Sequence, residues 1–204
     1  FYLRRARRLL PALFVMLATT TLVTWVFARA EMFRLRGDVL AALSYCTNWT
    51  QIVWNRGYFQ QLGRPSLLQH LWSLAVEEQF YLLWPLVLVA CLASRRRWVA
   101  LAVPVVLIVA SSLLMAGMFH AGHDPARVYY GTDTHLSPML IGAAMAVIVM
   151  RRQAGRTPDS ASGRAVADVL AVFGVIGLGW AALHVNYYSS GLYRGGYLLV
   201  GLCA

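Results

Sequence analysis

The chain has 204 residues, of which 59% are hydrophobic and 13% charged, and its mean hydropathy is +0.59. This composition excludes an ordinary soluble domain, in which about a quarter of the residues are charged. The net charge of +10 comes from arginine with no lysine, and the arginines lie in short clusters between apolar segments, so membrane headgroups and not nucleic acid are the expected anionic partner.

The chain opens on a basic cluster that leads into an uncharged apolar segment, 9–28. About 20 apolar residues cross a bilayer, so this segment is predicted to be a membrane span. Arg5 and Arg8 are one turn apart on a helical start, and Arg4 lies four residues from Arg8. These arginines could bind one anionic ligand together. The alternative from spacing alone is that they anchor the helix to anionic headgroups, at about 1 kcal/mol each.

Two adjacent acidic residues, Glu77 and Glu78, interrupt the apolar, helix-length segment 69–86. A carboxylate in hydrocarbon costs at least a few kcal/mol, so these side chains are expected to face a water-filled cavity, to lie at the headgroup boundary or to pair with arginine. On one helix, His70 and Glu77 would share a face, and Glu78 would be displaced by about 100°. Their backbones would be about 10 Å apart, so direct contact would need a bridging residue or substrate.

Further apolar segments after the glutamates are long enough, or nearly so, to be membrane spans: 98–119, 135–150, 169–185 and 193–204. The positive-inside rule places the basic clusters 4–8, 95–97 and 151–164 in the cytoplasm and 119–134 outside. This orientation requires that 37–54 does not cross the bilayer completely, so a re-entrant or interfacial helix is predicted there.

No metal site is predicted, because His120, His123 and His184 lack partners at metal-ligand spacing. The three cysteines lie in apolar surroundings without CxxC spacing, so neither a zinc site nor a disulfide framework is indicated.

Three motifs carry a resemblance to a known family. They are FYLRRARRLLP at 1–11, HLWSLAVEEQFY at 70–81, and YYGTDT at 129–134 followed by LIG at 140–142. In this order they resemble the signatures of the integral-membrane acyltransferase-3 family, the multi-span O-acyltransferases of surface and extracytoplasmic glycans. That family's pattern also has a histidine, held to be the catalytic base, in an earlier membrane helix. We therefore expect a fragment that lacks the first helices and is truncated at both ends.

The resemblance implies an all-α, polytopic transmembrane helical bundle that forms one membrane-embedded domain over residues 1–204. It implies transfer of an acyl group, most often acetyl, from cytosolic acyl-CoA to a hydroxyl of an extracytoplasmic sugar, glycan or glycolipid. Acyl-CoA is then a co-substrate and no bound cofactor is expected. The expected location is the bacterial cytoplasmic membrane.

Site residues follow from the same resemblance. Arg4, Arg5 and Arg8 are expected to bind the phosphates of acyl-CoA, because guanidinium groups match phosphate oxygens. The expected catalytic residues are His70, Glu77 and Glu78, in which a carboxylate orients a histidine base; pairing with a buried arginine is the alternative for one glutamate.

Acceptor binding is assigned to Tyr130 and Asp133. Asp133 could instead cap the helix that opens near His135, and Tyr129 and Tyr130 could belong to an aromatic belt. Position 135 is histidine where the family commonly has arginine. The alternative to an enzyme is a transporter or flippase with a polar intramembrane pathway. A third possibility is a membrane anchor for a soluble partner.

Overall fold

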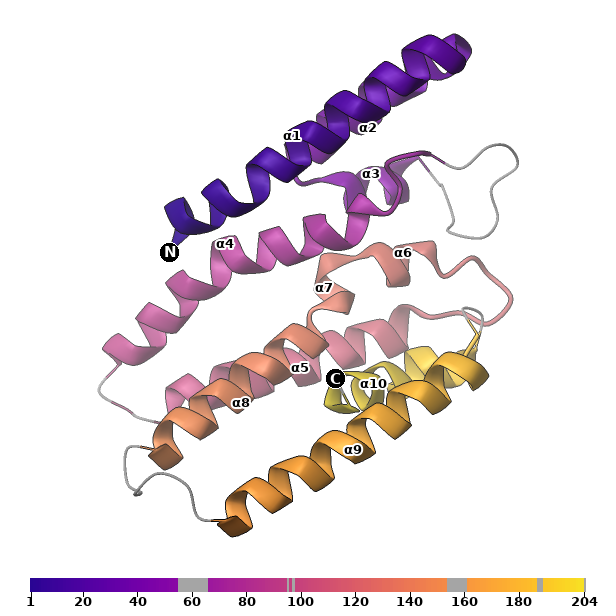
Figure 1. The fold of residues 1–204 in the computed structure, drawn as a ribbon. Coiled ribbons are helices and arrows are strands. Elements are labelled where there is room, and N and C mark those ends of the chain that lie inside the picture. Colours follow the sequence, from indigo (N-terminus) through magenta and orange to yellow (C-terminus); the bar gives the residue numbers. More distant parts are fainter. Residues whose placement is uncertain (55–65, 95, 97, 154–160, 187–188, 204) are drawn as a thin grey trace. The chain divides into compact units, whose positions relative to one another are not determined.

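The structure is a computed structural model that describes residues 1–54, 66–94, 96, 98–153, 161–186 and 189–203 (Figure 1). Within these residues every regular element is helical, which confirms the all-α prediction. The elements are α1 (Tyr2–Phe27), η1 (Arg29–Glu31), α2 (Met32–Leu43), α3 (Thr47–Val53), α4 (Leu71–Ala93), α5 (Val99–Met118), α6 (Ala126–Tyr130), α7 (Thr132–His135), α8 (Ser137–Gln153), α9 (Ala161–His184), η2 (Leu192–Gly196) and α10 (Tyr197–Cys203).

Three of these helices, α1, α4 and α5, are long and apolar enough to cross a membrane. Large apolar side chains such as Phe14 of α1 and Leu113 of α5 are exposed along them, as expected for surfaces that face lipid. The segments 137–151 and 168–184 form shorter apolar helices. Arg95, Arg97 and Arg156 lie outside the described residues, so the membrane orientation stays a prediction.

The threonines of α1 are accommodated without breaking the helix. The hydroxyls of Thr19, Thr21 and Thr24 each donate to the backbone carbonyl four residues earlier, at 2.7 to 2.8 Å. Such bonds satisfy a hydroxyl where water is absent, so polar residues remain compatible with a spanning helix.

The chain divides into two compact units, Phe1–Leu83 and Trp84–Ala204, and the boundary falls within α4. The prediction of a single domain over 1–204 stays a prediction.

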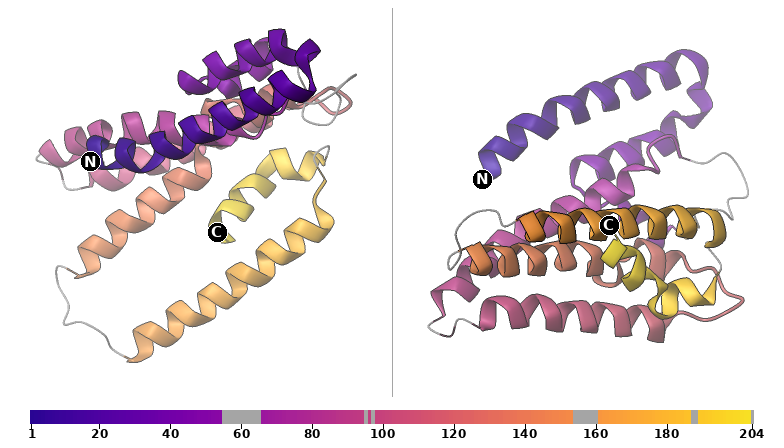
Figure 2. Two further views of the ribbon diagram at one scale, coloured as in Figure 1. Left: turned by 45° about the horizontal axis from the view of Figure 1, so that its top comes forward. Right: turned by 60° about the horizontal axis from the view of Figure 1, so that its bottom comes forward.

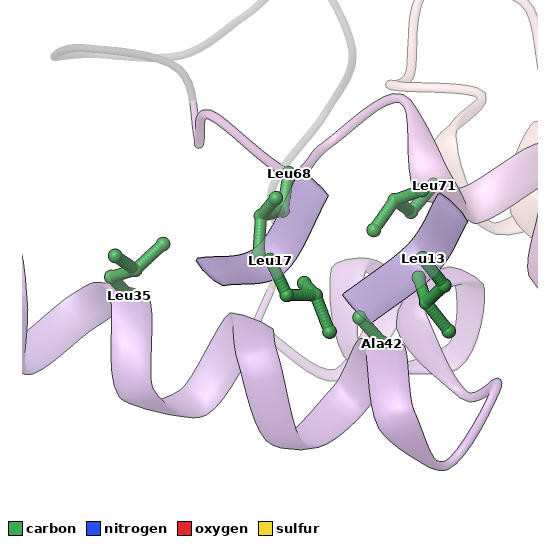
Figure 3. Packing of buried hydrophobic residues seen from close by; sticks show 6 residues of the cluster. All are labelled: Leu13, Leu17, Leu35, Ala42, Leu68 and Leu71. Atoms are coloured by element: carbon green, nitrogen blue, oxygen red, sulfur yellow. The ribbon is translucent and has the colours of Figure 1, made fainter. Parts of the chain in front are cut away.

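In the first unit, α1 packs against η1 and α2. Its core consists of leucines and one alanine from α1, from α2, from the turn before α4 and from the first residue of α4: Leu13, Leu17, Leu35, Ala42, Leu68 and Leu71 (Figure 3). Burial of these side chains fixes α2 against α1 and brings the start of α4 to the same cluster.

The segment 37–54 is not one continuous helix. Helix α2 ends at Leu43, a turn follows, and the chain continues as the seven-residue helix α3. Tyr45, in this turn, has φ 51°, a left-handed conformation that is unfavourable for a residue with a side chain. Neither α2 nor α3 alone has the length of a span, and the re-entrant or interfacial helix expected here stays a prediction.

In the second unit, α8 packs along α5, and α10 contacts both α8 and α9 (Figure 2). Gly201 of α10 allows a close approach to α8, because a side chain there would meet Pro138 and Ile141 at 3.1 to 3.2 Å. A separate cluster of Met115, Phe119, Val128 and Tyr193 joins the end of α5 to α6 and η2. The short helices α6 and α7 are thereby held at one end of α5.

Candidate active site

The first unit contains a charged pair between α1 and α4. The guanidinium of Arg5 donates to the Glu78 carboxylate from Nε at 3.0 and 3.2 Å and from Nη2 at 2.5 Å. The side chains are 25% and 14% exposed, so both charges are largely removed from solvent. Breaking such a pair leaves an uncompensated charge, which is strongly unfavourable. Glu78 is therefore the glutamate that pairs with arginine, which was the alternative to a catalytic role.

An aromatic ring completes the surroundings of Arg5. Its Cζ lies 3.5 Å from the centroid of the Tyr81 ring, a cation–π contact. Glu78 and Tyr81 are three residues apart on α4 and share a face, so one helix turn supplies both partners. The Tyr2 hydroxyl also donates to the Leu82 carbonyl at 2.8 Å. The start of α1 is thus attached to α4 by several specific contacts.

The next residue of α4, Gln79, holds the α2–α3 turn. Its Nε2 donates to the Tyr45 carbonyl at 2.7 Å and to Oδ1 of Asn48 at 3.0 Å. Consecutive residues of the Glu77-Glu78-Gln79 motif therefore hold two different elements, α1 and the α2–α3 turn. Neither Gln79 nor Asn48 was among the predicted site residues, although Gln79 lies within the 70–81 signature.

Polar side chains also occupy the buried face of α3. Thr47, Asn48 and Gln51 are at most 1% exposed, although all three carry hydrogen-bonding groups. The positions 47, 48 and 51 lie on one helical face. Sequence reasoning missed this face, because a seven-residue helix has too short a periodic pattern to indicate which side is buried.

The structure separates the three arginines expected to bind acyl-CoA. Arg5 is engaged by Glu78 and Tyr81, whereas Arg4 and Arg8 are exposed. Arg4 and Arg8 are therefore two exposed basic residues one turn apart at the start of α1.

The expectation that His70 lies on one helix with the glutamates is wrong. α4 begins at Leu71, and His70 is an exposed residue of the turn before it, so helical periodicity does not place it on the Glu77 face. The reason is that the Ser66 hydroxyl and the carbonyls of 66–69 organise this segment as successive turns that end where the helix starts. Glu77 is exposed on α4.

In the second unit, Asp133 is held by Arg127. Two parallel hydrogen bonds join them, from Nη1 to Oδ1 at 2.9 Å and from Nη2 to Oδ2 at 2.7 Å. The bidentate hydrogen bond from Arg127 is the main cause that lowers the pKa of the Asp133 carboxyl below its usual value. Asp133 is therefore an oriented, ionised carboxylate near neutral pH.

The absence of a side chain at Gly131 leaves space for the Arg127–Asp133 pair. A Cβ at this position would lie 2.1 Å from Nη1 of Arg127 and 2.6 Å from Oδ1 of Asp133. Thr134 adds a hydrogen bond from its hydroxyl to the Val128 carbonyl at 2.7 Å, which ties α7 back to α6. The GTDT motif thus builds a compact clamp between two short helices.

Tyr130, the second predicted acceptor residue, and His135, where the family commonly has arginine, both lie among aromatic rings. Tyr130 is 0% exposed and packs edge-to-face against Tyr129, so its ring is part of the core. His135 contacts the Tyr129 ring and makes a hydrogen bond with the Tyr197 hydroxyl. A cavity of about 380 Å³ lies beside the clamp, lined in part by His120, His123 and Arg127.

Three helices are long and apolar enough to span a bilayer, and each unit contains ionised side chains paired with one another. These features are typical of helical membrane proteins with a polar functional site. The chain matches the model of the acyltransferase domain known as acyltransferase-3 over residues 1–204, and it belongs to that family.

Relatives agree with this assignment. The chain is 38% identical over 209 residues to YrhL of Bacillus subtilis, provisionally named a peptidoglycan O-acetyltransferase, and 36% identical over 208 residues to the peptidoglycan O-acetyltransferase OatA of Listeria monocytogenes. These matches cover 100% and 99% of this chain, and the chain spans only about a third (32%) of the length of each relative. No solved structure matches the chain.

Proposed function

We propose that this chain is the membrane part of an enzyme that O-acetylates a cell-wall glycan. The observation that carries the proposal is the Arg5–Glu78 pair together with Gln79, a polar arrangement within apolar helices that joins the basic motif at 1–11 to the motif at 70–81. The names of the relatives in Listeria and Bacillus support peptidoglycan, or a glycan of that kind, as the acceptor. The bacterial cytoplasmic membrane is the proposed location.

The proposed donor is acyl-CoA, with acetyl as the acyl group. The exposed Arg4 and Arg8 support this, because guanidinium groups on one turn suit the phosphates of a coenzyme A moiety. Arg5 has a different role, because it holds Glu78 and fixes the start of α1 against α4. Binding of the donor is therefore attributed to two of the three arginines.

The proposed reaction is direct transfer. The acceptor hydroxyl oxygen attacks the thioester carbonyl carbon while a base takes the hydroxyl proton. The tetrahedral oxyanion then collapses, the carbon–sulfur bond breaks, and the thiolate leaves and takes up a proton. The products are the O-acyl glycan and free thiol.

The groups that act in this reaction are assigned as follows. The base is the histidine that the family resemblance expects before residue 1, and His70 is the second candidate. The exposed Glu77 is proposed to orient the base or to stabilise its protonated form. Glu78, bound to Arg5, is a positioning residue. Asp133, oriented by Arg127, is proposed to bind the acceptor, and the buried Tyr130 of α6 is assigned a packing role.

The test uses the full-length protein in proteoliposomes. Radiolabelled acetyl-CoA is supplied on one side and a soluble peptidoglycan fragment on the other, and label in the glycan is measured. We expect transfer that Glu77→Gln abolishes, with the protein still folded. Movement of substrate without acylation would instead identify a transporter, and labelling by a donor other than acetyl-CoA would overturn the donor assignment alone.

A further inference from the structure

The buried polar face of α3 carries groups without hydrogen-bond partners. Among the described residues, Nε2 and Oε1 of Gln51 and Oγ1 of Thr47 are buried and make no hydrogen bond. Both side chains are 1% exposed, and positions 47 and 51 are one turn apart on the same face. Three unpaired polar atoms are therefore concentrated on one turn of one helix.

Such atoms are destabilising when nothing binds them. Nearly all buried polar groups in folded proteins have a partner, so an exception indicates a bound water, a ligand or a catalytic role. An isolated orphan could be a packing accident. Here the turn before the helix that carries the orphans has an unfavourable backbone conformation at Tyr45. Two hydrogen bonds from Gln79, to the Tyr45 carbonyl and to Asn48, hold this turn and the start of the helix in place. Strain and orphaned groups side by side are typical of functional sites.

The location connects this face to the proposed chemistry. Gln79, which bonds Asn48 of α3, follows directly after Glu78 of the Arg5–Glu78 pair. The turn of α4 that carries the charged pair is therefore attached to the α3 face. Both belong to the first unit.

Two of the three orphaned atoms, Nε2 of Gln51 and Oγ1 of Thr47, are neutral donors, and the third, Oε1 of Gln51, is an acceptor. The Gln51 amide has N–H donors, and the Thr47 hydroxyl has one. Neutral donors whose hydrogen-bonding capacity is unfilled at rest suit an oxygen that becomes negative only during the reaction. Acyl transfer creates such an oxygen, whereas a resident anion would be bound better by the arginines of the same unit.

We propose that Thr47 and Gln51 form the oxyanion site of the acyl transfer, an inference that rests on the proposed function. The Gln51 amide and the Thr47 hydroxyl donate to the thioester carbonyl oxygen. As the acceptor hydroxyl adds to the carbonyl carbon and its proton passes to the base, these donors stabilise the oxyanion. When the carbon–sulfur bond breaks, the oxygen returns to a carbonyl and the product ester is released.

The experiment measures kcat, KM and thermal stability in the full-length protein with acetyl-CoA as the donor. Gln51→Met and Thr47→Val remove the donors with little change of volume. Each is expected to lower kcat about 10²- to 10³-fold, with KM within about threefold. The melting temperature is expected to stay level or rise, because an unpaired buried polar group has been replaced by an apolar one. A merely structural role would not combine lost turnover with retained stability.

Two further variants complete the test. Thr50→Val is the matched control on the same helix, because the Thr50 hydroxyl already donates to the Thr47 carbonyl, and its kcat is expected to stay within about threefold of the parent. Thr47→Ser restores the donor and is expected to recover most of the activity lost in Thr47→Val. The proposal is overturned if Gln51→Met keeps its kcat within threefold, which would mean that only water occupies the face, or if Thr47→Ser fails to recover activity. Absence of acyl transfer by the parent protein would overturn the proposed function as well.

Discussion

Arg5 and Glu78 are 73 positions apart in the chain, yet three hydrogen bonds join the guanidinium to the carboxylate. The contact fixes the start of α1 against the first third of α4. It also removes from solvent a carboxylate that stands in an otherwise apolar helix. The family's basic motif and its acidic motif are thus partners within one unit.

The first prediction concerns the stability of this pair. Glu78→Gln leaves the largely buried Arg5 charge without its counter-charge, so the free energy of unfolding should fall by about 1–3 kcal/mol, less than for a fully buried pair because Arg5 keeps some solvent contact. Thermal unfolding in detergent measures this. Glu77→Gln is the matched control, because Glu77 is exposed and its melting temperature should hardly change. Arg5→Met combined with Glu78→Leu should regain part of the loss; equal losses in the double and single variants would contradict the pairing.

The second prediction separates the arginines by role. Arg4→Ala and Arg8→Ala should each raise the KM for acyl-CoA about tenfold, because a charge-assisted hydrogen bond to phosphate is lost, while kcat stays within about threefold. Steady-state kinetics with varied acyl-CoA measures this. Arg7→Ala removes an exposed charge from the same cluster and is the control. Equal, small effects of all three variants would show that the cluster only anchors the helix to headgroups.

The third prediction concerns Glu77 as a participant in proton transfer. Glu77→Gln should lower kcat about 10²-fold or more without loss of stability, and Glu77→Asp should keep part of the activity. His70→Ala should lower kcat by no more than about tenfold, because His70 lies in the turn before α4 and is only the second candidate for the base. A His70→Ala loss as large as that of Glu77→Gln would instead identify His70 as the base.

The fourth prediction concerns pH and the Arg127–Asp133 clamp. The pKa of Asp133 is lower in the folded protein than in the unfolded chain, so the pair stabilises the fold at neutral pH, and this contribution is lost as the pH falls through the lowered pKa. Asp133→Asn should therefore lower the melting temperature at pH 7, and the difference from the parent should shrink steadily as the pH is lowered into the acid range. The effect at pH 7 should be about 1 kcal/mol or less, because both side chains keep about a third of their exposure. A difference between parent and variant that does not depend on pH would contradict the clamp.

The fifth prediction concerns the space beside that clamp. Gly131→Ala places a methyl group where Arg127 and Asp133 meet, so the bidentate geometry should be lost and the free energy of unfolding should fall by about 1–3 kcal/mol. Gly142→Ala is the control, because a methyl group there meets no atom within 4 Å, and α8 should be unchanged or slightly more stable. Thermal unfolding of both variants in one detergent measures the difference. Equal effects of the two substitutions would contradict the close approach of Arg127 and Asp133 to Gly131.

Much of the fold was predictable from particular segments. Long uncharged runs such as 9–28 and 98–119 specify helices, because in a bilayer a helix satisfies all its backbone groups within one segment. The helix start at Leu71 was not predictable to the residue, since helix ends depend on local hydrogen bonds that hydropathy does not reveal. The side chain of His70 was misplaced for that reason.

The candidate site divides in the same way. The sequence alone determined that acidic and basic side chains stand within apolar segments, and the physical cost of burying charge requires partners for them. Only the tertiary structure decided which partners: Arg5 for Glu78, Arg127 for Asp133 and the α3 turn for Gln79. The reason is that hydropathy and helical periodicity describe one helix at a time, whereas a partner on another helix is selected by packing between elements. These elements can be distant in the chain, as for Arg5 and Glu78, or neighbours across a turn, as for Arg127 and Asp133. The buried face of Thr47 and Gln51 belongs to the second kind, because a seven-residue helix has a buried side only once its neighbours are in place.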